Sequence, residues 1–311
     1  MEENKVRQDL LEVHDLSISF KMYDNNLEQK YLKVISEMSL NVRRGEIIAI
    51  AGSSGSGKSL LAHALLGILP DNALVSGSML YEGRELTPAY QKQLRGREMA
   101  LIPQSVAYLD PLMQIWEQVR GVRGTAAAQK EAFRRYELSE KVERLYPFQL
   151  SGGMARRALV ATAIVNDAEL IVADEPTPGL DLKFAMLALQ QFRELADQGK
   201  GVILITHDID LAFNIADRIA VFYAGTTVEI AAAAAFKGSG EQLRHPYTRA
   251  LFRALPQNAF EPIPGGQPYP GKLPDGCLFG PRCPHCTESC LKKIPMRKDE
   301  HGWVRCIKYG S

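Results

Sequence analysis

The 311-residue sequence lacks any apolar run approaching the ~18–20 residues that a membrane-spanning helix needs. Its first ten residues, MEENKVRQDL, carry acids and lack an apolar signal segment, which predicts a cytosolic chain without a secretory signal. An excess of one charge is also missing, since 37 Lys and Arg face 36 Asp and Glu. This balance removes the general electrostatic case for binding nucleic acid.

Cysteine is absent before position 277, and all five cysteines lie between 277 and 306. The cysteines are therefore one local feature and do not form a disulfide framework for the whole fold. The hydrophobic fraction of 46% and the charged fraction of 23% are typical of globular chains. These values exclude wholesale disorder, collagen and coiled coil.

Short apolar runs separated by helical segments dominate the rest of the chain. Residues 46–51, 170–173 and 201–206 have the composition of buried parallel strands. Residues 58–69 and 185–196 have helical composition. The order strand, loop, helix predicts an α/β fold with a parallel sheet.

The domain organisation follows from where this composition changes. Residues 1–250 are predicted to form one domain, with a helical subdomain inserted at about residues 87–165. Residues 251–311 are rich in proline, glycine and cysteine, which predicts an extended C-terminal extension without a large core of its own.

A phosphate-binding loop of the form G-x-x-x-x-G-K-S lies between a predicted buried strand and a predicted helix. Its glycines allow backbone N–H groups to surround phosphates, and the helix N-terminus adds positive potential. Lys58 is expected to reach the β- and γ-phosphates of a nucleotide, and Ser59 to ligate Mg²⁺. The eight residues are Gly52, Ser53, Ser54, Gly55, Ser56, Gly57, Lys58 and Ser59.

Two acidic residues, Asp174 and Glu175, end the apolar run 170–173. They fall at the carboxyl edge of the predicted sheet, where parallel α/β sheets bind ligands. Because this pair follows a phosphate loop in the sequence, Asp174 is expected to hold Mg²⁺ through water or through Ser59. Glu175 is expected to orient or deprotonate the attacking water.

The sequence Leu-Ser-Gly-Gly-Met at 150–154 resembles the LSGGQ signature of the ATP-binding-cassette (ABC) ATPases, with Met in place of Gln. Serine and two glycines at a helix start expose N–H groups to an anion. The resemblance covers residues 10–250 and implies a P-loop NTPase fold with an antiparallel β part and ATP as ligand. It also implies that Ser151, Gly152 and Gly153 bind the ATP held by a second cassette.

Further residues match the family's motifs in order. The resemblance implies that Gln104 contacts Mg²⁺, that Asp181 belongs to a loop at the nucleotide, and that His207 contacts the γ-phosphate. Together with Lys58 and Glu175, His207 completes the expected catalytic set. Phe20 is expected to stack on adenine, and Tyr23 and Tyr31 are alternatives.

The cysteine-rich segment, with the sequence HPYTRAL at 245–251, resembles the C-terminal region of oligopeptide, dipeptide and nickel importer ATPases. Some of those ATPases hold a 4Fe-4S cluster on four cysteines, which correspond here to Cys277, Cys283, Cys290 and Cys306. Zinc on the same thiolates, or no metal, are the alternatives. Cys286 is additional to the family's pattern.

These resemblances imply an ATPase that powers an importer for peptides, or for nickel and related small solutes, at the cytoplasmic face of the cell membrane. The expected partners are two transmembrane permease subunits, gripped by the region 104–116, and a second ABC ATPase, expected to be a paralogue. A solute-binding protein would join through the complex, and no nucleic acid is expected. The alternatives are a non-transport ABC ATPase acting on nucleic acid or ribosomes, and an ATP-switched regulatory module.

Overall fold

The computed structural model describes residues 9–23, 28–53 and 55–309. Its main sheet has the strand order β11-β12-β10-β9-β3-β8-β7-β6 within these residues, and the run from β9 to β6 is parallel. The strands are β3 (Ile47–Gly52), β6 (Met99–Ile102), β7 (Leu170–Asp174), β8 (Gly201–Thr206), β9 (Arg218–Tyr223), β10 (Thr226–Ala232), β11 (Arg297–Asp299) and β12 (Gly302–Val304). The parallel α/β core predicted from the apolar runs is confirmed.

A second, antiparallel sheet packs beside the main sheet in the order β2-β1-β4-β5. Its strands are β1 (Asp9–Tyr23), β2 (Gln29–Arg43), β4 (Ala73–Tyr81) and β5 (Arg84–Glu85). Leu11, Ile18 and Ile35 of this sheet are fully buried in one core with Ile48 and Ile50 of β3. This shared core fixes the antiparallel sheet against the strand that leads into the phosphate loop.

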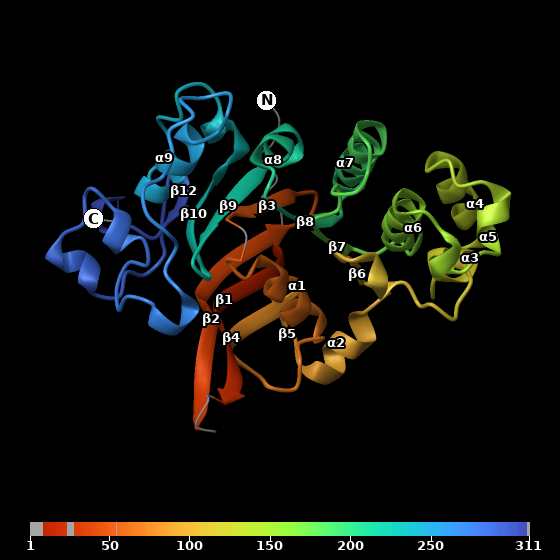
Figure 1. Cartoon of the computed structure of the whole chain (residues 1–311), viewed down its shortest axis with the longest axis horizontal. Helices are drawn as coiled ribbons and strands as arrows, with labels where there is room; N and C mark the ends of the chain where they lie inside the picture. Colours follow the sequence, from red (N-terminus) through yellow and green to blue (C-terminus); the bar gives the residue numbers. More distant parts are fainter. Residues whose placement is uncertain (1–8, 24–27, 54, 310–311) are drawn as a thin grey trace.

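Helices cover the main sheet and form the inserted subdomain. They are α1 (Lys58–Leu66), α2 (Pro88–Leu94), α3 (Ile115–Arg120), α4 (Ala126–Arg135), α5 (Glu140–Glu143), α6 (Gly152–Val165), α7 (Leu182–Asp197), α8 (Ile209–Ile215) and α9 (Pro246–Arg253). Figure 1 shows α3 to α6 at the opposite end of the molecule from the C-terminal extension. Among the described residues, no helix is both long and apolar enough to span a membrane.

Two predicted boundaries differ from the structure. β6 belongs to the main sheet although it lies inside the range 87–165 predicted for the helical subdomain. The predicted boundary at residue 250 falls within α9. Both differences arise because strand pairing and helix packing join segments that the composition separates.

The C-terminal extension is more integrated than the sequence predicts. β12 pairs with β10 and β11 pairs with β12, so the extension adds two antiparallel strands to the main sheet. Phe279 and Val304 are buried at 2% and 0% exposure. The extension therefore shares the core of the cassette. The proline-rich composition did not predict this pairing, because both strands lie after residue 296, beyond the prolines.

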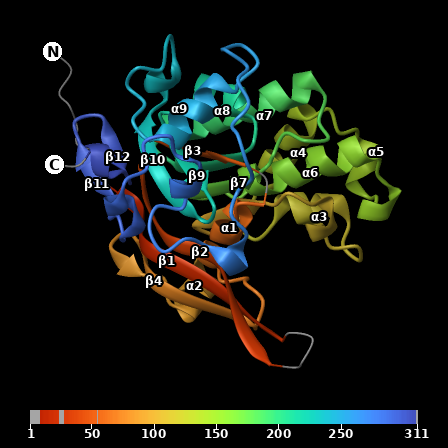
Figure 2. The same cartoon turned by 60° about the vertical axis from the view of Figure 1, so that its left-hand side comes forward.

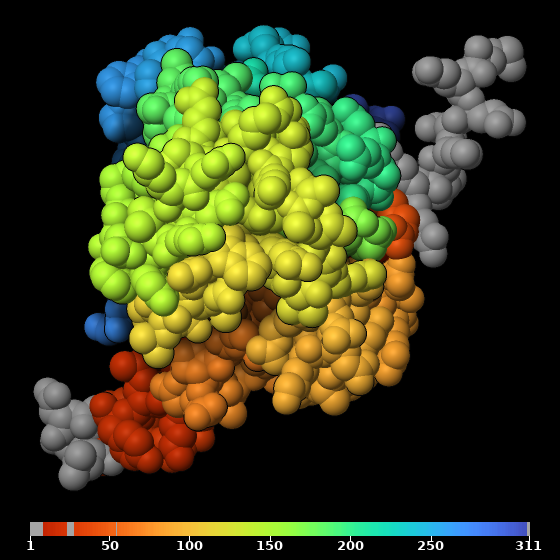
Figure 3. Space-filling view, turned by 90° about the vertical axis from the view of Figure 1, so that its right-hand side faces the viewer, coloured from red at the N-terminus to blue at the C-terminus, as the bar shows by residue number. Residues whose placement is uncertain are grey.

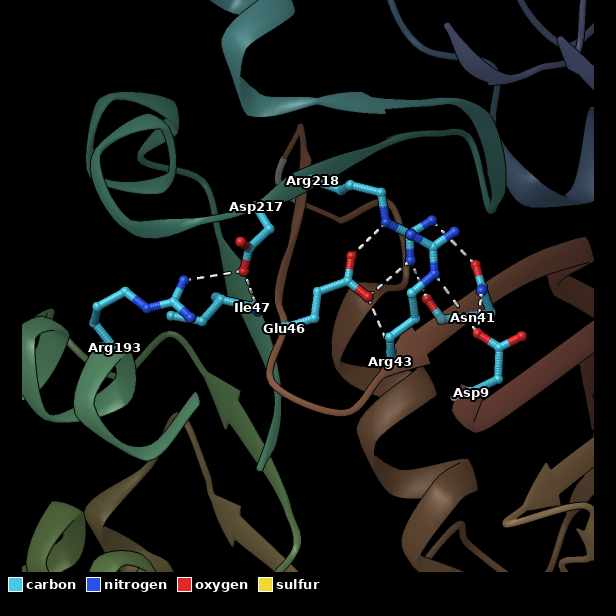
Figure 4. A network of polar contacts seen from close by, with 8 residues as sticks. All are labelled: Asp9, Asn41, Arg43, Glu46, Ile47, Arg193, Asp217 and Arg218. Carbon is cyan, nitrogen blue, oxygen red and sulfur yellow. Dashed lines mark hydrogen bonds and ion pairs between the residues drawn. The ribbon is translucent and has the colours of Figure 1, made fainter. Parts of the chain in front are cut away.

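A polar network anchors the start of β3, the strand that carries the phosphate loop (Figure 4). The buried Glu46 carboxylate pairs with Arg218 and accepts a hydrogen bond of 2.9 Å from the Arg43 N–H. Arg218 also donates to the Asn41 backbone oxygen at 2.9 Å. Since Asn41 and Arg43 belong to β2 and Arg218 to β9, the network joins the two sheets.

Candidate active site

The phosphate loop runs from the end of β3 to the start of α1, as the motif predicts. A Cβ atom at Gly52 would lie 2.3 Å from the Phe222 carbonyl oxygen of β9, so only glycine fits there. Gly57 precedes α1 with a φ of 89°, a left-handed conformation that glycine adopts without strain. Ser54 lies outside the described residues.

Lys58 is buried at the base of this loop, with 6% exposure. Its Nζ donates to the carbonyl oxygens of Gly52 and Ser53, both at 2.9 Å. Burial lowers the pKa of the Lys58 ammonium, and the charges of Glu175 and Asp174 oppose that effect. The ammonium therefore lies beside the loop that would hold phosphates, with neutral acceptors that a phosphate can replace.

Asp174 ends β7 and is 3% exposed. Burial raises the pKa of its carboxyl group, while a hydrogen bond with the Ser59 side chain opposes the rise. One carboxylate oxygen, Oδ1, is buried without a hydrogen-bond partner among the described residues. A hydroxyl and an unpaired carboxylate oxygen are the hard donors that Mg²⁺ prefers, so Ser59 and Asp174 suit the predicted role.

Glu175 and His207 meet at the edge of the sheet, although 31 residues separate them in sequence. His207 Nδ1 lies 2.6 Å from Glu175 Oε2. The Glu175 side chain is 13% exposed, so one of its faces remains accessible to water. Glu175 has a φ of 49°, which is uncommon for a residue with a side chain and typical of functional sites. A carboxylate held by an imidazole can position a water molecule and accept its proton.

The signature segment lies at the open N-terminus of α6. Ser151 caps this helix by accepting a hydrogen bond of 3.3 Å from the Met154 N–H. A Cβ atom at Gly152 would meet nothing within 4 Å, and the nearest atom to one at Gly153 would be 3.9 Å away. The surface is therefore free to receive an anion from outside the chain.

The other residues predicted to contact nucleotide make contacts within the protein. The Asp181 carboxylate accepts a hydrogen bond from Phe184 N–H at 3.1 Å and so caps α7. Phe20 is half-buried against the core that β1 shares with β3, while Tyr23 and Tyr31 are more than half exposed. Gln104 is exposed after β6, and its backbone oxygen is held by a buried arginine. Their contacts with a nucleotide stay predictions.

Two known protein families match parts of the chain. Residues 35–178 match the family described as "ABC transporter", and residues 228–290 match "Oligopeptide/dipeptide transporter, C-terminal region". The chain is 33% identical over 321 aligned residues to the oligopeptide transport ATP-binding protein OppD of Salmonella typhimurium, covering 96% of this chain and 93% of OppD. The chain belongs to the ABC transporter ATPase family.

Other relatives agree with this ABC assignment. OppD of Lactococcus lactis subsp. cremoris is 35% identical, over 94% of this chain and 91% of the relative. The solved ATP-binding cassette MJ0796, a dimer in a post-hydrolysis state with ADP and Pi, has a TM-score of 0.62 and 25% identity. The superposed region covers 72% of this chain and 98% of the MJ0796 chain. The predicted ABC fold and ATP hydrolysis are thus confirmed.

Arg156 is a site residue that the motifs of the ABC family did not reveal. It lies on α6, directly after the signature segment, and is 3% exposed. Its guanidinium donates to the backbone oxygens of Pro103 and Gln104 at 2.8 Å each, and to that of Pro176 at 3.1 Å. It also donates to the backbone oxygen of Glu175. One buried cation thereby ties the signature helix to the segments after β6 and β7.

The sequence signal for this role was weak. Arg156 and Arg157 are adjacent charges in an otherwise apolar helix of 14 residues, a pattern equally consistent with a solvent-facing side. Only the packing shows that Arg156 points inward.

Replacing Arg156 with Met keeps the length of the side chain and removes every donor. Because four carbonyl oxygens then lose their partner, we expect the free energy of unfolding to fall by about 3 kcal/mol. Urea denaturation followed by circular dichroism measures this change. Arg134→Met is the matched control, since Arg134 is 77% exposed and pairs with Glu131 on the same helix. Equal stability of the two variants would contradict the role of Arg156.

The four cysteines predicted to bind a cluster gather around one small cavity of about 30 Å³, which Cys277, Cys283, Cys290 and Cys306 all line. Cys286 is exposed and does not line it. Burial raises the pKa of the Cys277 thiol to about 11, and the neighbouring cysteines add to the rise. Within the described part of the chain, however, no group of three or more His, Cys, Asp or Glu side chains is arranged to hold a metal ion. The iron–sulfur cluster is therefore not supported and stays a prediction.

Proposed function

We propose that this ABC ATPase powers the import of peptides through separate membrane subunits, at the cytoplasmic face of the cell membrane. The observation that carries the proposal is the match of residues 228–290 to the oligopeptide/dipeptide transporter C-terminal region, outside the general cassette. Relatives named as peptide import or oligopeptide transport ATP-binding proteins support it along nearly the whole chain. Nickel and related small solutes are the second substrate class.

Within this function, the site residues keep the roles that the motifs predict. Lys58 binds the β- and γ-phosphates, Ser59 and Asp174 hold Mg²⁺, and Glu175 accepts the proton of the attacking water. His207 orients Glu175 and senses the γ-phosphate. The contact between Glu175 and His207 supports a hydrolytically competent cassette over a degenerate one.

A second ABC ATPase, which we propose to be a paralogue, completes the site. The support is the open surface at Ser151 to Gly153, where a Cβ atom at Gly152 would meet no described atom within 4 Å. In a head-to-tail pair this surface would cover the partner's nucleotide, and each ATP would lie between two chains. A solute-binding protein would act through the assembled complex.

Two permease subunits are proposed to dock beside the helical subdomain. A cavity of about 310 Å³ opens at the C-terminal ends of α1, α2 and α3, against β6 and α6. Leu66, Leu101 and Ala163 line it, and Figure 3 shows a hollow in that region. In the nearby segment 104–116, Leu112 is 87% exposed. Apolar surface of this kind marks interaction sites.

Uptake of a labelled oligopeptide by cells that lack the chain tests the proposal. We expect uptake to be lost, to return with the wild-type chain, and to stay absent with Glu175→Gln. Uptake of labelled Ni²⁺ is measured in parallel to test the second substrate class. Whether the chain co-purifies with membrane proteins or co-sediments with ribosomes separates the transporter from the ribosome-acting alternative. The proposal of a peptide importer would be rejected if cells without the chain took up peptide normally and lost Ni²⁺ uptake instead. It would also be rejected if they took up peptide normally and the chain associated with ribosomes.

We also propose that residues 251–311 carry a 4Fe-4S cluster on Cys277, Cys283, Cys290 and Cys306. The convergence of these four residues on one cavity, which excludes Cys286, supports the choice of ligands. The side chains must rearrange to hold the cluster, because as they lie they form no ligand group. The bound cluster would supply a covalent staple for the extension rather than a catalytic step.

Replacing Cys283 with Ser should remove iron from protein purified without oxygen. About four irons per chain and absorbance near 400 nm are the expected properties of the wild type, as an order-of-magnitude guide for thiolate-bound clusters. Cys286→Ser is the matched control and should keep its iron, since Cys286 lies outside the cavity. Iron-free wild-type protein, or equal iron loss in both variants, would reject the assignment.

A further inference from the structure

The C-terminal extension reaches the phosphate loop directly. Gln267 lies in the segment after α9, and its Oε1 accepts a hydrogen bond of 2.5 Å from the Ser53 hydroxyl of the loop. Beyond it, Pro270–Lys272 packs against β2, with Leu32 beside Gly271. In Figure 2 the chain after α9 runs past α1 down to the antiparallel sheet. The extension therefore crosses the loop that binds phosphates.

Tyr247 of α9 reaches the same serine from the interior. Its side chain is 3% exposed and lies within hydrogen-bonding reach of the side chain and backbone of Ser53. Ser53 thus has two contacts with residues that follow the core of the cassette in sequence.

An aromatic cluster joins Tyr247 to the cysteine segment. The Tyr247 ring lies 4.4 Å from Tyr223 and 5.4 Å from Phe279, measured between ring centroids. Tyr223 and Phe279 are 5.4 Å apart and meet edge to face. Because Phe279 lies between Cys277 and Cys283, the cluster links the cysteine segment to the loop through buried, closely packed side chains.

Arg282 provides a second link. It donates to the backbone oxygens of Pro264 at 2.7 Å and Ile263 at 3.0 Å, and to the Tyr223 hydroxyl at 3.2 Å. Arg282 thereby holds the stretch that leads to Gln267 against the aromatic cluster. Both routes from the cysteine segment end on Ser53.

We propose that Tyr247 and Gln267 are positioning residues for the phosphate loop, so that order in the C-terminal extension and affinity for ATP are coupled. A loop held in place loses less conformational freedom when it closes on phosphates, so the contacts favour binding. Coupling is reciprocal, and ATP must therefore stabilise the extension by the same factor. The proposal concerns nucleotide binding and holds for any substrate of the importer.

The test measures the Kd of Mg-ATP for the full-length chain by calorimetry. Gln267→Ala removes the acceptor of the Ser53 hydroxyl, so we expect the Kd to rise about two- to ten-fold, the effect of one hydrogen bond. Tyr247→Phe, which keeps the ring packing and removes one hydroxyl, should act in the same direction. Tyr136→Phe is the matched control, because its buried hydroxyl in the helical subdomain has no partner among the described residues.

Two further readouts separate positioning from general loss of structure. In a Ser53→Ala background, Gln267→Ala should add little to the Kd, since the hydroxyl that donates to Gln267 is already gone. Hydrogen exchange of residues 263–283 should slow on addition of ATP in the wild type and much less in Tyr247→Phe. An unchanged or lower Kd, full additivity with Ser53→Ala, or equal ATP protection in both proteins would overturn the proposal.

Discussion

Glu175→Gln should bind Mg-ATP with nearly wild-type affinity and lose most of its turnover, by about 10²–10³-fold. The amide keeps the shape of the side chain and its contact with His207, which lies 2.6 Å from the carboxylate in the wild type. It removes the proton acceptor and the negative charge that orients water. ATP hydrolysis by the assembled transporter, with the Kd for ATP measured in parallel, gives the two quantities.

The matched control is Glu131→Gln. Glu131 is exposed on α4, where it pairs with Arg134 of the same helix, and such surface pairs contribute little. We expect wild-type turnover from it. If Glu175→Gln turned over ATP as fast as this control, Glu175 would not be the base.

Ser151→Arg should abolish hydrolysis by the assembled complex and spare ATP binding by the isolated chain. The serine lies at the exposed N-terminus of α6, where Gly152 and Gly153 leave the surface open. A bulky cation there would occupy the space of the partner's γ-phosphate and prevent closure. We expect turnover to fall by more than about 10²-fold, because closure assembles the catalytic groups.

Ser139→Arg makes the same change at another exposed serine, which precedes α5 in the helical subdomain. It should hydrolyse ATP at the wild-type rate. Dimer formation with ATP, followed by size-exclusion chromatography of hydrolysis-deficient protein, separates a closure defect from a binding defect. Normal turnover by the Ser151→Arg complex would show that the signature surface does not contact nucleotide.

Much of the site was predictable because its motifs are local. The phosphate loop, Asp174 and Glu175, and His207 each follow a short apolar strand, and parallel strands end at one edge of a sheet. Gly57 was predictable for the same reason, since its positive φ in the turn demands glycine, whereas the close approach of the Phe222 oxygen to Gly52 depends on the pairing of β3 with β9. The signature segment was recognisable from its resemblance to LSGGQ, and the structure adds that the helix start is uncovered.

What tertiary structure alone decided are the contacts between segments far apart in the chain. No local pattern distinguishes Arg156, which holds four backbone oxygens, from its neighbour Arg157. Likewise, the three-residue strands β11 and β12 are too short to carry a periodic signal, and they gain stability because β12 pairs with β10 and β11 pairs with β12. The contacts of Tyr247 and Gln267 with Ser53 span about two hundred residues, as the 214-residue separation of Ser53 and Gln267 shows. Sequence by itself therefore determined which groups carry the chemistry. Packing decided which distant side chains hold those groups in place, because those side chains become neighbours of the site only in the folded chain.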